Sequence, residues 1–249
     1  MRMNRARAIE GIFNYCTRRC ESCPFTERCT LYQSEREYEQ SHPAASSADQ
    51  ARDSFAETFR LLEEWCRREG VDFDDIRRDA QSDESRAEIG RADDAIRADP
   101  LQKLATGYTH ATLSVVDAMA AARATCQWSV EVDAALDTIA WHSGMVSAKV
   151  HRALHGLAER GQYCQEDPVQ NDWNGSAKLA RIIVSESQQA WRVVLRAGEA
   201  PDHSPLLELV VLLDRIDQAL LERFPRAMEF VRPGFDEPLV TRALPAGCG

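Results

Sequence analysis

The chain has 249 residues, of which 44% are hydrophobic and 28% charged, as in folded globular proteins. Its 30 Lys and Arg against 40 Asp and Glu give a net charge of −10, which argues against a large nucleic-acid surface because such surfaces are basic. No apolar stretch reaches the length of a membrane span, and the N-terminus lacks the apolar region of a secretory signal. We therefore expect a cytoplasmic protein that binds neither membranes nor nucleic acid.

Four of the eight cysteines lie within fourteen residues near the N-terminus. They are Cys16, Cys20, Cys23 and Cys29, with the spacing C-x3-C-x2-C-x5-C. Cytoplasmic proteins seldom keep disulfides, so a dense cysteine cluster predicts a metal or redox site. Residues 1–29 also hold six Arg against three Glu, a net charge of +3, whereas the rest of the chain carries −13.

Two cofactors suit these cysteines. A [4Fe–4S] cube takes one thiolate at each of its four irons, so four cysteines on one compact loop can hold it. A proline directly follows the third cysteine, as in bacterial ferredoxin-type sites, and the arginines of the motif could offset the charge of the cluster. Structural zinc usually takes two separated C-x2-C pairs, and only Cys20 and Cys23 form such a pair. We predict a [4Fe–4S] cluster, with zinc as the alternative.

Residues 19–29, RCESCPFTERC, resemble the cluster loop of endonuclease III-type DNA glycosylases, which ends in C-x2-C-x5-C and holds a [4Fe–4S] cluster. The first gap differs, since that family has six residues where this chain has three. No helix-hairpin-helix motif accompanies the loop, so the resemblance implies a cluster and not DNA repair. The first three cysteines also spell the C-x3-C-x2-C of radical SAM enzymes, but the strands that such enzymes need are not predicted. The whole chain is similar to uncharacterised bacterial helical proteins with an N-terminal cysteine motif.

Helical periodicity dominates the chain after the cysteines. Residues 30–48 are predicted to be a linker, and residues 71–99 a short helix with solvated loop. Long amphipathic helices are expected at about 50–70, 100–126, 129–159, 175–197 and 204–224. Asp99 followed by Pro100 marks one helix start, and Asn174 is the expected cap of another.

These elements predict an all-α fold, an antiparallel bundle of about five helices with an N-terminal cysteine-rich metal-binding loop packed against one end. We divide the chain into a cysteine-rich arm and linker (1–48), a helical bundle (49–228) and an irregular C-terminal tail (229–249). A short helix is expected at the start of the arm, over residues 4–15. It carries few apolar residues, so we expect metal ligation to hold the arm in place.

Three further candidate sites carry weaker signals. His142, Glu186 and Asp217 interrupt predicted apolar stripes and could form a second metal site in the bundle, although no Glu-x-x-His pair is present. The polar loop 170–178 opens a helix and contains Lys178, so it could bind an anion or small molecule. Cys164 lies in a polar turn and could be a reactive thiol.

The sequence therefore predicts an iron–sulfur protein that transfers electrons or senses redox state through a protein partner. Two alternatives stay open. The first is a redox enzyme or metal oxidase with a second metal or ligand site in the bundle core, and the second is a zinc-stabilised interaction module. No nucleophile elbow, P-loop or dinucleotide-binding motif points to another reaction.

Overall fold

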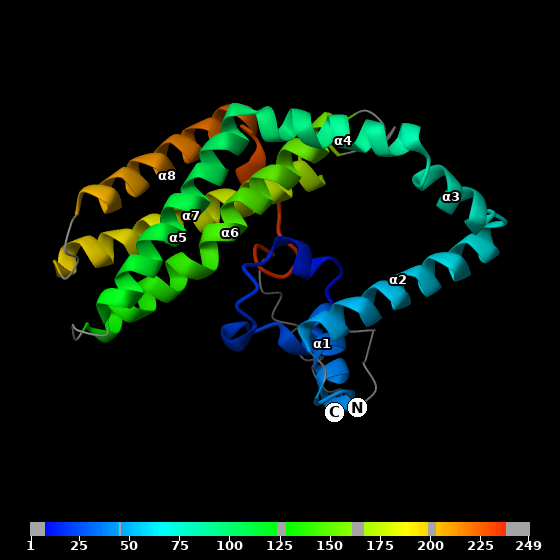
Figure 1. Cartoon of the computed structure of the whole chain (residues 1–249), viewed down its shortest axis with the longest axis horizontal. Coiled ribbons are helices and arrows are strands. Elements are labelled where there is room, and N and C mark those ends of the chain that lie inside the picture. Colours follow the sequence, from blue (N-terminus) through cyan, green and yellow to red (C-terminus); the bar gives the residue numbers. More distant parts are fainter. Residues whose placement is uncertain (1–7, 45, 124–127, 161–166, 199–202, 238–249) are drawn as a thin grey trace, which may run out of the picture.

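The computed structural model describes residues 8–44, 46–123, 128–160, 167–198 and 203–237 (Figure 1). These residues form eight α-helices joined by turns and short 3-10 helices, and no strand occurs among them. The all-α prediction is confirmed. The helices are α1 (Thr30–Ser41), α2 (Ser47–Glu69), α3 (Phe73–Ala80), α4 (Asp83–Ala98), α5 (Pro100–Arg123), α6 (Val130–Ala158), α7 (Asp172–Ala197) and α8 (Ser204–Arg223).

Helices α5 to α8 pack side by side and run in alternating directions (Figure 1). They correspond to four of the five predicted long helices, and their starts follow local signals in the sequence. The Asp99 carboxylate, for example, accepts the Leu101 amide at 2.8 Å, with Pro100 as the first helical residue. The predicted apolar stripes meet in a shared core. Its largest fully buried side chains include Trp191, Tyr108, Ile139, Leu179, Ile183, Leu213, Ile216, Leu220, Val132 and Val146.

The predicted five-helix bundle is not confirmed, because α2 packs against α3 rather than among α5 to α8. Figure 1 shows α2, α3 and α4 following an arc that starts beside α1, away from the packed helices, and reaches them through α4. Only α4 joins the core, where Ile96 is buried against α5 and α6. Phe55 and Phe59 of α2 are 68% and 57% exposed, although the helix predicted at about 50–70 was expected to belong to the bundle.

The predicted linker at residues 30–48 contains α1, so that interpretation was wrong. Its Glu and Gln residues form helices well, but it holds few apolar residues, so its composition indicated a linker. The Tyr38 hydroxyl donates to the Asp53 carboxylate at 2.8 Å and ties α1 to α2. The segment 71–99, expected to be a short helix with solvated loop, forms two helices, α3 and α4.

None of the helices that the structure describes combines the length and apolar character needed to span a membrane. Three of the eight cysteines, Cys126, Cys164 and Cys248, lie outside the described residues, as do residues 238–249 of the predicted tail. The reactive-thiol prediction for Cys164 is therefore not addressed.

Candidate functional site

The cysteine arm, residues 8–29, is a closed loop. The Ile9 amide donates to the Arg28 carbonyl at 3.0 Å, which joins the two ends of the arm. Between them lie three single-turn 3-10 helices, Ile12–Tyr15, Cys20–Ser22 and Thr26–Arg28. The helix expected over residues 4–15 is reduced, within the described part, to the first of these turns. Gly11, with φ 68°, starts this turn in a conformation that glycine adopts without strain.

The four thiols of the motif are free and half-buried, and all four lie on the arm. Burial raises the pKa of the Cys16 thiol, and the neighbouring Cys29 and Cys23 raise it further, while Arg18 lowers it. Burial likewise raises the pKa of Cys20. Arg18 lowers this pKa, and Cys16 and Cys23 raise it. The arm therefore carries all four predicted ligands, and Arg18 is close enough to influence the pKa of Cys16 and Cys20.

The loop does not provide a site for a single ion as it stands. Among the described residues, no three Cys, His, Asp or Glu side chains are arranged to hold one metal ion. Tetrahedral zinc needs its sulfur ligands about 2.3 Å from a common centre. A cube carries its thiolates on four separate irons, so its ligands surround a larger body and do not meet at one point.

The arm lies against the middle of α6, not against an end of the helices as we expected. Three contacts along α6 hold the arm, two of them at its backbone carbonyls and one at a side chain. Lys149 Nζ donates to the Asn14 carbonyl at 2.9 Å, and Trp141 Nε1 donates to the Thr17 carbonyl at 2.8 Å. Arg19 pairs with Asp137 at 2.7 Å, and its guanidinium lies over the Trp141 ring.

Tyr15 anchors the arm to the start of α7. Its hydroxyl donates to Asp172 at 2.8 Å, and Arg152 of α6 binds the same carboxylate through two nitrogens at 2.8 and 2.7 Å. Burial raises the pKa of Tyr15, and the Asp172 carboxylate adds to this effect. The Tyr15 ring packs on Phe230 with centroids 4.7 Å apart. Gly175 makes this approach possible, because a Cβ there would lie 2.4 Å from Tyr15 Cε1.

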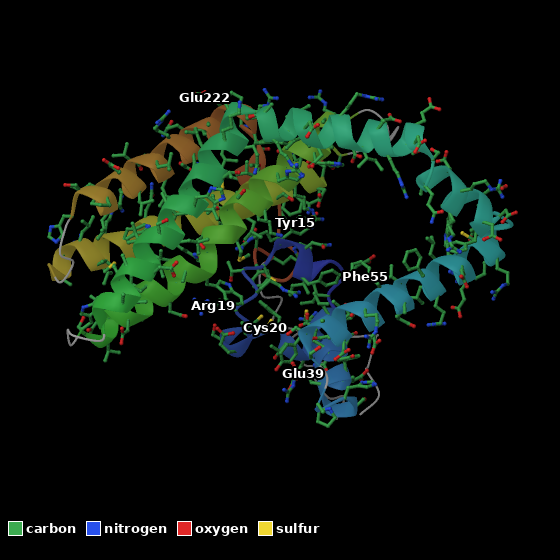
Figure 2. All side chains as sticks on the ribbon, in the orientation of Figure 1. Tyr15, Arg19, Cys20, Glu39, Phe55 and Glu222 are labelled. Atoms are coloured by element: carbon green, nitrogen blue, oxygen red, sulfur yellow. The ribbon has the colours of Figure 1, made fainter. Side chains whose placement is uncertain are left out.

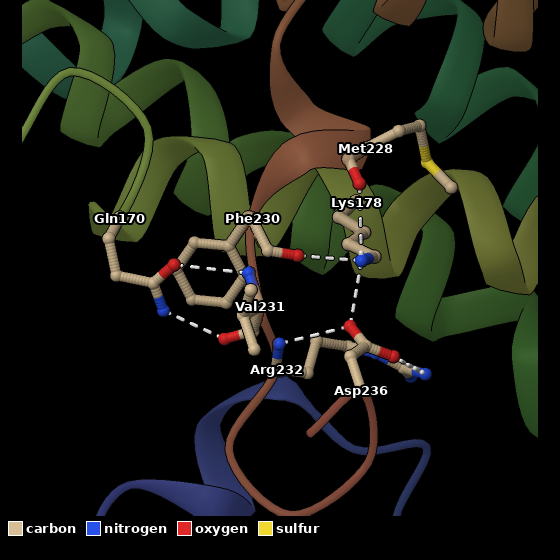
Figure 3. Close-up of polar contacts among 7 residues, drawn as sticks. All are labelled: Gln170, Lys178, Met228, Phe230, Val231, Arg232 and Asp236. Atoms are coloured by element: carbon tan, nitrogen blue, oxygen red, sulfur yellow. Dashed lines mark hydrogen bonds and ion pairs between the residues drawn. The ribbon is translucent and has the colours of Figure 1, made fainter. Parts of the chain in front are cut away.

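A C-terminal segment, residues 224–237, forms the other side of the docking site (Figure 3). Lys178 of α7 donates to the Phe230 carbonyl at 2.6 Å and pairs with Asp236 at 2.7 Å. Arg232 binds the same Asp236 carboxylate through its backbone amide and its side chain. The predicted anion site at residues 170–178 loses its cation in this way, since Lys178 is buried and already bonded.

The helix cap expected at Asn174 is also misplaced. The Asn171 side chain caps α7 by accepting the Asn174 amide at 2.9 Å, so the helix begins at Asp172. Asx caps commonly accept from the third residue after them, and both asparagines lie in the same polar run. The Asn174 side chain instead donates to the carbonyls of Pro168 and Val169.

The C-terminal segment contacts the cysteine arm directly. Ile9 and Ile12 are buried, and their Cδ1 atoms would lie 2.9 and 3.0 Å from a Cβ placed on Gly234. Phe25 meets Phe235 edge to face at 5.1 Å between ring centroids. We expected the arm to bury too little apolar surface to dock without metal ligation, but apolar burial and hydrogen bonds that involve no thiol already dock it.

A pocket of about 530 Å³ opens where the arm meets α6 and α7. Its lining includes Thr17, Arg19 and Ser22, each next to a cysteine of the motif, and the predicted second-site residues His142 and Glu186. His142 is 2% exposed, with Nε2 3.4 Å from the Glu186 carboxylate and Nδ1 without a hydrogen-bond partner.

Asp217 does not complete the predicted site with His142 and Glu186. It is held by Arg181, whose Nε and second nitrogen lie 2.7 and 3.2 Å from the two carboxylate oxygens. A carboxylate bound by a guanidinium in this manner is already neutralised. The structure therefore brings together two of the three predicted residues.

The buried histidine makes the stability of the fold depend on pH. Burial, with Arg19 nearby, lowers the pKa of His142 to about 4 from an ordinary 6.5. The unfolded chain then binds more protons between these values, so the free energy of unfolding falls as pH drops from 6.5 to 4, by about 2–3 kcal/mol. Glu186, whose pKa is raised by burial, acts in the opposite direction. Urea unfolding at pH 7 and pH 4.5 measures the difference.

His142→Gln cannot titrate, so the histidine contribution should be lost. The free energy of unfolding should then fall less between pH 7 and pH 4.5 than it does in the wild type. His110→Gln, at an exposed position of α5, serves as the control and should keep the wild-type dependence. Equal pH dependence in wild type and His142→Gln would show that the folded protein protonates His142 as readily as the unfolded chain does.

Comparison with protein-family models, with curated proteins and with solved structures gave no match for this chain. Sequence reasoning found the thiols and the His142–Glu186 pair, but it missed the residues that dock the arm. The Tyr15 hydroxyl and the Trp141 Nε1–H are polar groups on otherwise apolar rings, and such groups commonly find a hydrogen-bond partner. The sequence could not identify these partners, because each lies over a hundred residues away.

Proposed function

We propose that this chain is an iron–sulfur protein whose [4Fe–4S] cluster is held by Cys16, Cys20, Cys23 and Cys29. It would transfer electrons, or sense redox state, through a protein partner in the cytoplasm. The observation that carries the proposal is the presence of four free, half-buried thiols on one closed loop. The resemblance of residues 19–29 to a known cluster loop supports the same cofactor.

The charge around the loop suits an anionic cluster. Four thiolates on an oxidised cube leave a net negative charge, which nearby cations and hydrogen-bond donors stabilise. Arg18 lowers the pKa of both Cys16 and Cys20, so its charge reaches these sulfurs. Arg18 adopts a left-handed conformation with φ 59° and is tied to Glu35 of α1 at 2.9 Å.

Two features favour redox activity over a purely structural role. The arm is docked by contacts that involve no thiol, such as those of Tyr15 and Trp141, so a metal is not required to attach it. The loop also presents Glu21, Ser22 and Pro24 to solvent between and beside the cysteines. A cluster in this loop would lie near the surface, where a protein partner can approach it.

Metal and sulfide analysis of the full chain, purified without oxygen, tests the proposal. We expect a brown protein with about four irons and four sulfides per chain, the content of one cube. Colourless protein with one zinc per chain would overturn the cluster and favour a zinc-stabilised interaction module. Protein that binds neither metal, even after incubation with iron and sulfide under reducing conditions, would overturn the proposal as a whole.

A redox enzyme is the second candidate, and the pocket beside the arm favours it. The pocket borders the cysteine loop and contains a buried histidine next to a carboxylate, a pair that can exchange protons. A small molecule bound there would lie between this pair and the loop. Iron in clear excess over sulfide, lost on His142→Ala, would support a second metal in the pocket.

A further inference from the structure

Two histidines and two carboxylates lie together where α4 packs against α6. His151 and His155 are one turn apart on α6, and their ring centroids are 6.4 Å apart. His151 Nε2 lies 3.4 Å from the carboxylate of Asp93 on α4. His155 Nδ1 lies 3.3 Å from the carboxylate of Glu159, which ends α6. The histidine pair is therefore half-enclosed by acidic groups from two helices.

The spacing of the histidine pair suits a shared metal ion. Side chains four residues apart on a helix lie on the same face and can reach one ligand. The same spacing supplies the two histidine ligands of zinc in helices that contain H-E-x-x-H. Each imidazole nitrogen binds such an ion at about 2.0–2.1 Å. The separation of 6.4 Å between the ring centroids leaves room for one ion between the rings.

The carboxylates occupy one nitrogen of each ring and leave the other nitrogen available. Asp93 lies beside Nε2 of His151, and Glu159 lies beside Nδ1 of His155. Among the described residues, none bonds to His151 Nδ1 or to His155 Nε2. Histidines that bind a metal usually show this arrangement, because a carboxylate accepts the N–H of one nitrogen and leaves the lone pair of the other for the ion.

The charges around the histidine pair favour a cation. Both rings line a pocket of about 340 Å³, together with Glu159 and the ion pair of Arg152 with Asp172. Arg97 neutralises Asp93 in the same way. Within the described part of the chain, Glu159 has no Lys or Arg partner, so the group keeps a net negative charge when its histidines are neutral. A bound divalent ion would compensate this charge.

The arrangement supplies two direct protein ligands. No third Cys, His, Asp or Glu side chain among the described residues is placed to hold the same ion. Two positions of a tetrahedral ion would then remain for water or a small molecule, and open positions are typical of catalytic metal sites and not of structural ones. Imidazole nitrogens suit zinc, copper and nickel, whereas calcium and magnesium prefer oxygen ligands.

We propose that His151 and His155 bind one divalent transition-metal ion, with Asp93 and Glu159 orienting the two rings and water in the open positions. This site is distinct from the cysteine arm, and it does not depend on a cluster there. Figure 2 shows Tyr15 on the side of the arm near the packed helices and Cys20 farther from them. The ion would also strengthen the attachment of α4 to α6, because Asp93 belongs to α4.

Electron paramagnetic resonance of added Cu²⁺ tests the site in the full chain, after iodoacetamide has blocked the thiols as competing ligands. We expect one Cu²⁺ per chain with the nuclear modulation of two imidazoles. His151→Gln/His155→Gln should lose this signal and raise the dissociation constant about tenfold or more. His110→Gln, at an exposed position of α5, is the control and should bind as the wild type does. Copper that never saturates at one per chain, or that keeps two imidazoles in the double variant, would overturn the proposal.

The carboxylates provide a second test that leaves both metal ligands in place. Loss of such a partner commonly weakens metal binding about 10–100-fold, so Asp93→Asn and Glu159→Gln should each raise the dissociation constant by about this factor. Asp94→Asn, at the exposed neighbouring position, is the matched control and should have no effect. Equal weakening by Asp93→Asn and Asp94→Asn would contradict the orienting role. Cys20→Ser should bind Cu²⁺ as the wild type does, so a failure of the cluster and a failure of this site can be told apart.

Discussion

A Cys20→Ser variant should lose its iron and sulfide while its N-terminal arm stays docked. Cys20 lies in the middle of the motif, and replacing its thiolate removes one of the four ligands of a cube. Iron and sulfide, about four each in the wild type, should fall close to zero in the purified variant. The docking contacts of Tyr15, Thr17 and Arg19 involve no thiol, so they should persist.

Trypsin cleavage after Arg18 and Arg19 reports the state of the arm. We expect the Cys20→Ser variant to resist trypsin there nearly as well as the wild type. Cys66→Ser, at the buried cysteine of α2 outside the motif, is the matched control and should retain all its iron. Full iron in Cys20→Ser would contradict the cluster assignment, whereas rapid cleavage would show that the cofactor, and not the docking contacts, holds the arm.

Gly175→Ala should release the arm although it changes no cysteine, whereas Cys20→Ser changes a cysteine and should leave the arm docked. A Cβ at this position would lie 2.4 Å from Tyr15 Cε1 and 2.8 Å from Phe230 Cζ. The Tyr15 ring cannot retreat easily, because its hydroxyl is bonded to Asp172 and its face packs on Phe230. Overpacking of this kind typically costs about 1–3 kcal/mol, so cleavage of the arm should accelerate about tenfold or more.

The same substitution at Gly144 isolates the steric effect. Gly144 lies within α6, and a Cβ there meets no atom within 4 Å. Alanine is the better helix former, so Gly144→Ala should stabilise the protein by about 0.5–1 kcal/mol and leave the arm protected. Equal protease sensitivity in the two variants would mean that the Tyr15–Phe230 contact does not hold the arm.

Much of the helical structure could be predicted because its signals are local. The Asp99–Pro100 start of α5 and the Gly70 end of α2 act on backbone groups within one turn. The stripes of α5 to α8 repeat every three or four residues, and they placed these helices within a few residues of their observed bounds. Only one short helix with solvated loop was predicted where α3 and α4 lie, although Asp72 and Ser82 cap them, because their sequences are rich in charged residues and hold few apolar ones.

The candidate site, too, could be predicted only where its signals are local. Spacing along fourteen residues identified the four cysteines, and the structure places all four on one short arm. The partners of other polar residues lie far away in sequence: Lys178 binds the segment around Phe230, and Asp217 binds Arg181. Sequence reasoning assigned these two side chains to an anion site and a metal site, because a charged residue does not reveal which distant group neutralises it.

The sequence by itself determined that this protein is helical and that its N-terminal cysteines form one cluster of potential ligands. Only the tertiary structure decided where the arm docks, which residues dock it and which of the predicted helices pack together. Caps and periodicity act between residues up to about four positions apart, so the sequence displays them directly. The contact of Tyr15 with Asp172 joins residues 157 positions apart, and such contacts depend on how whole helices pack, which no local pattern records.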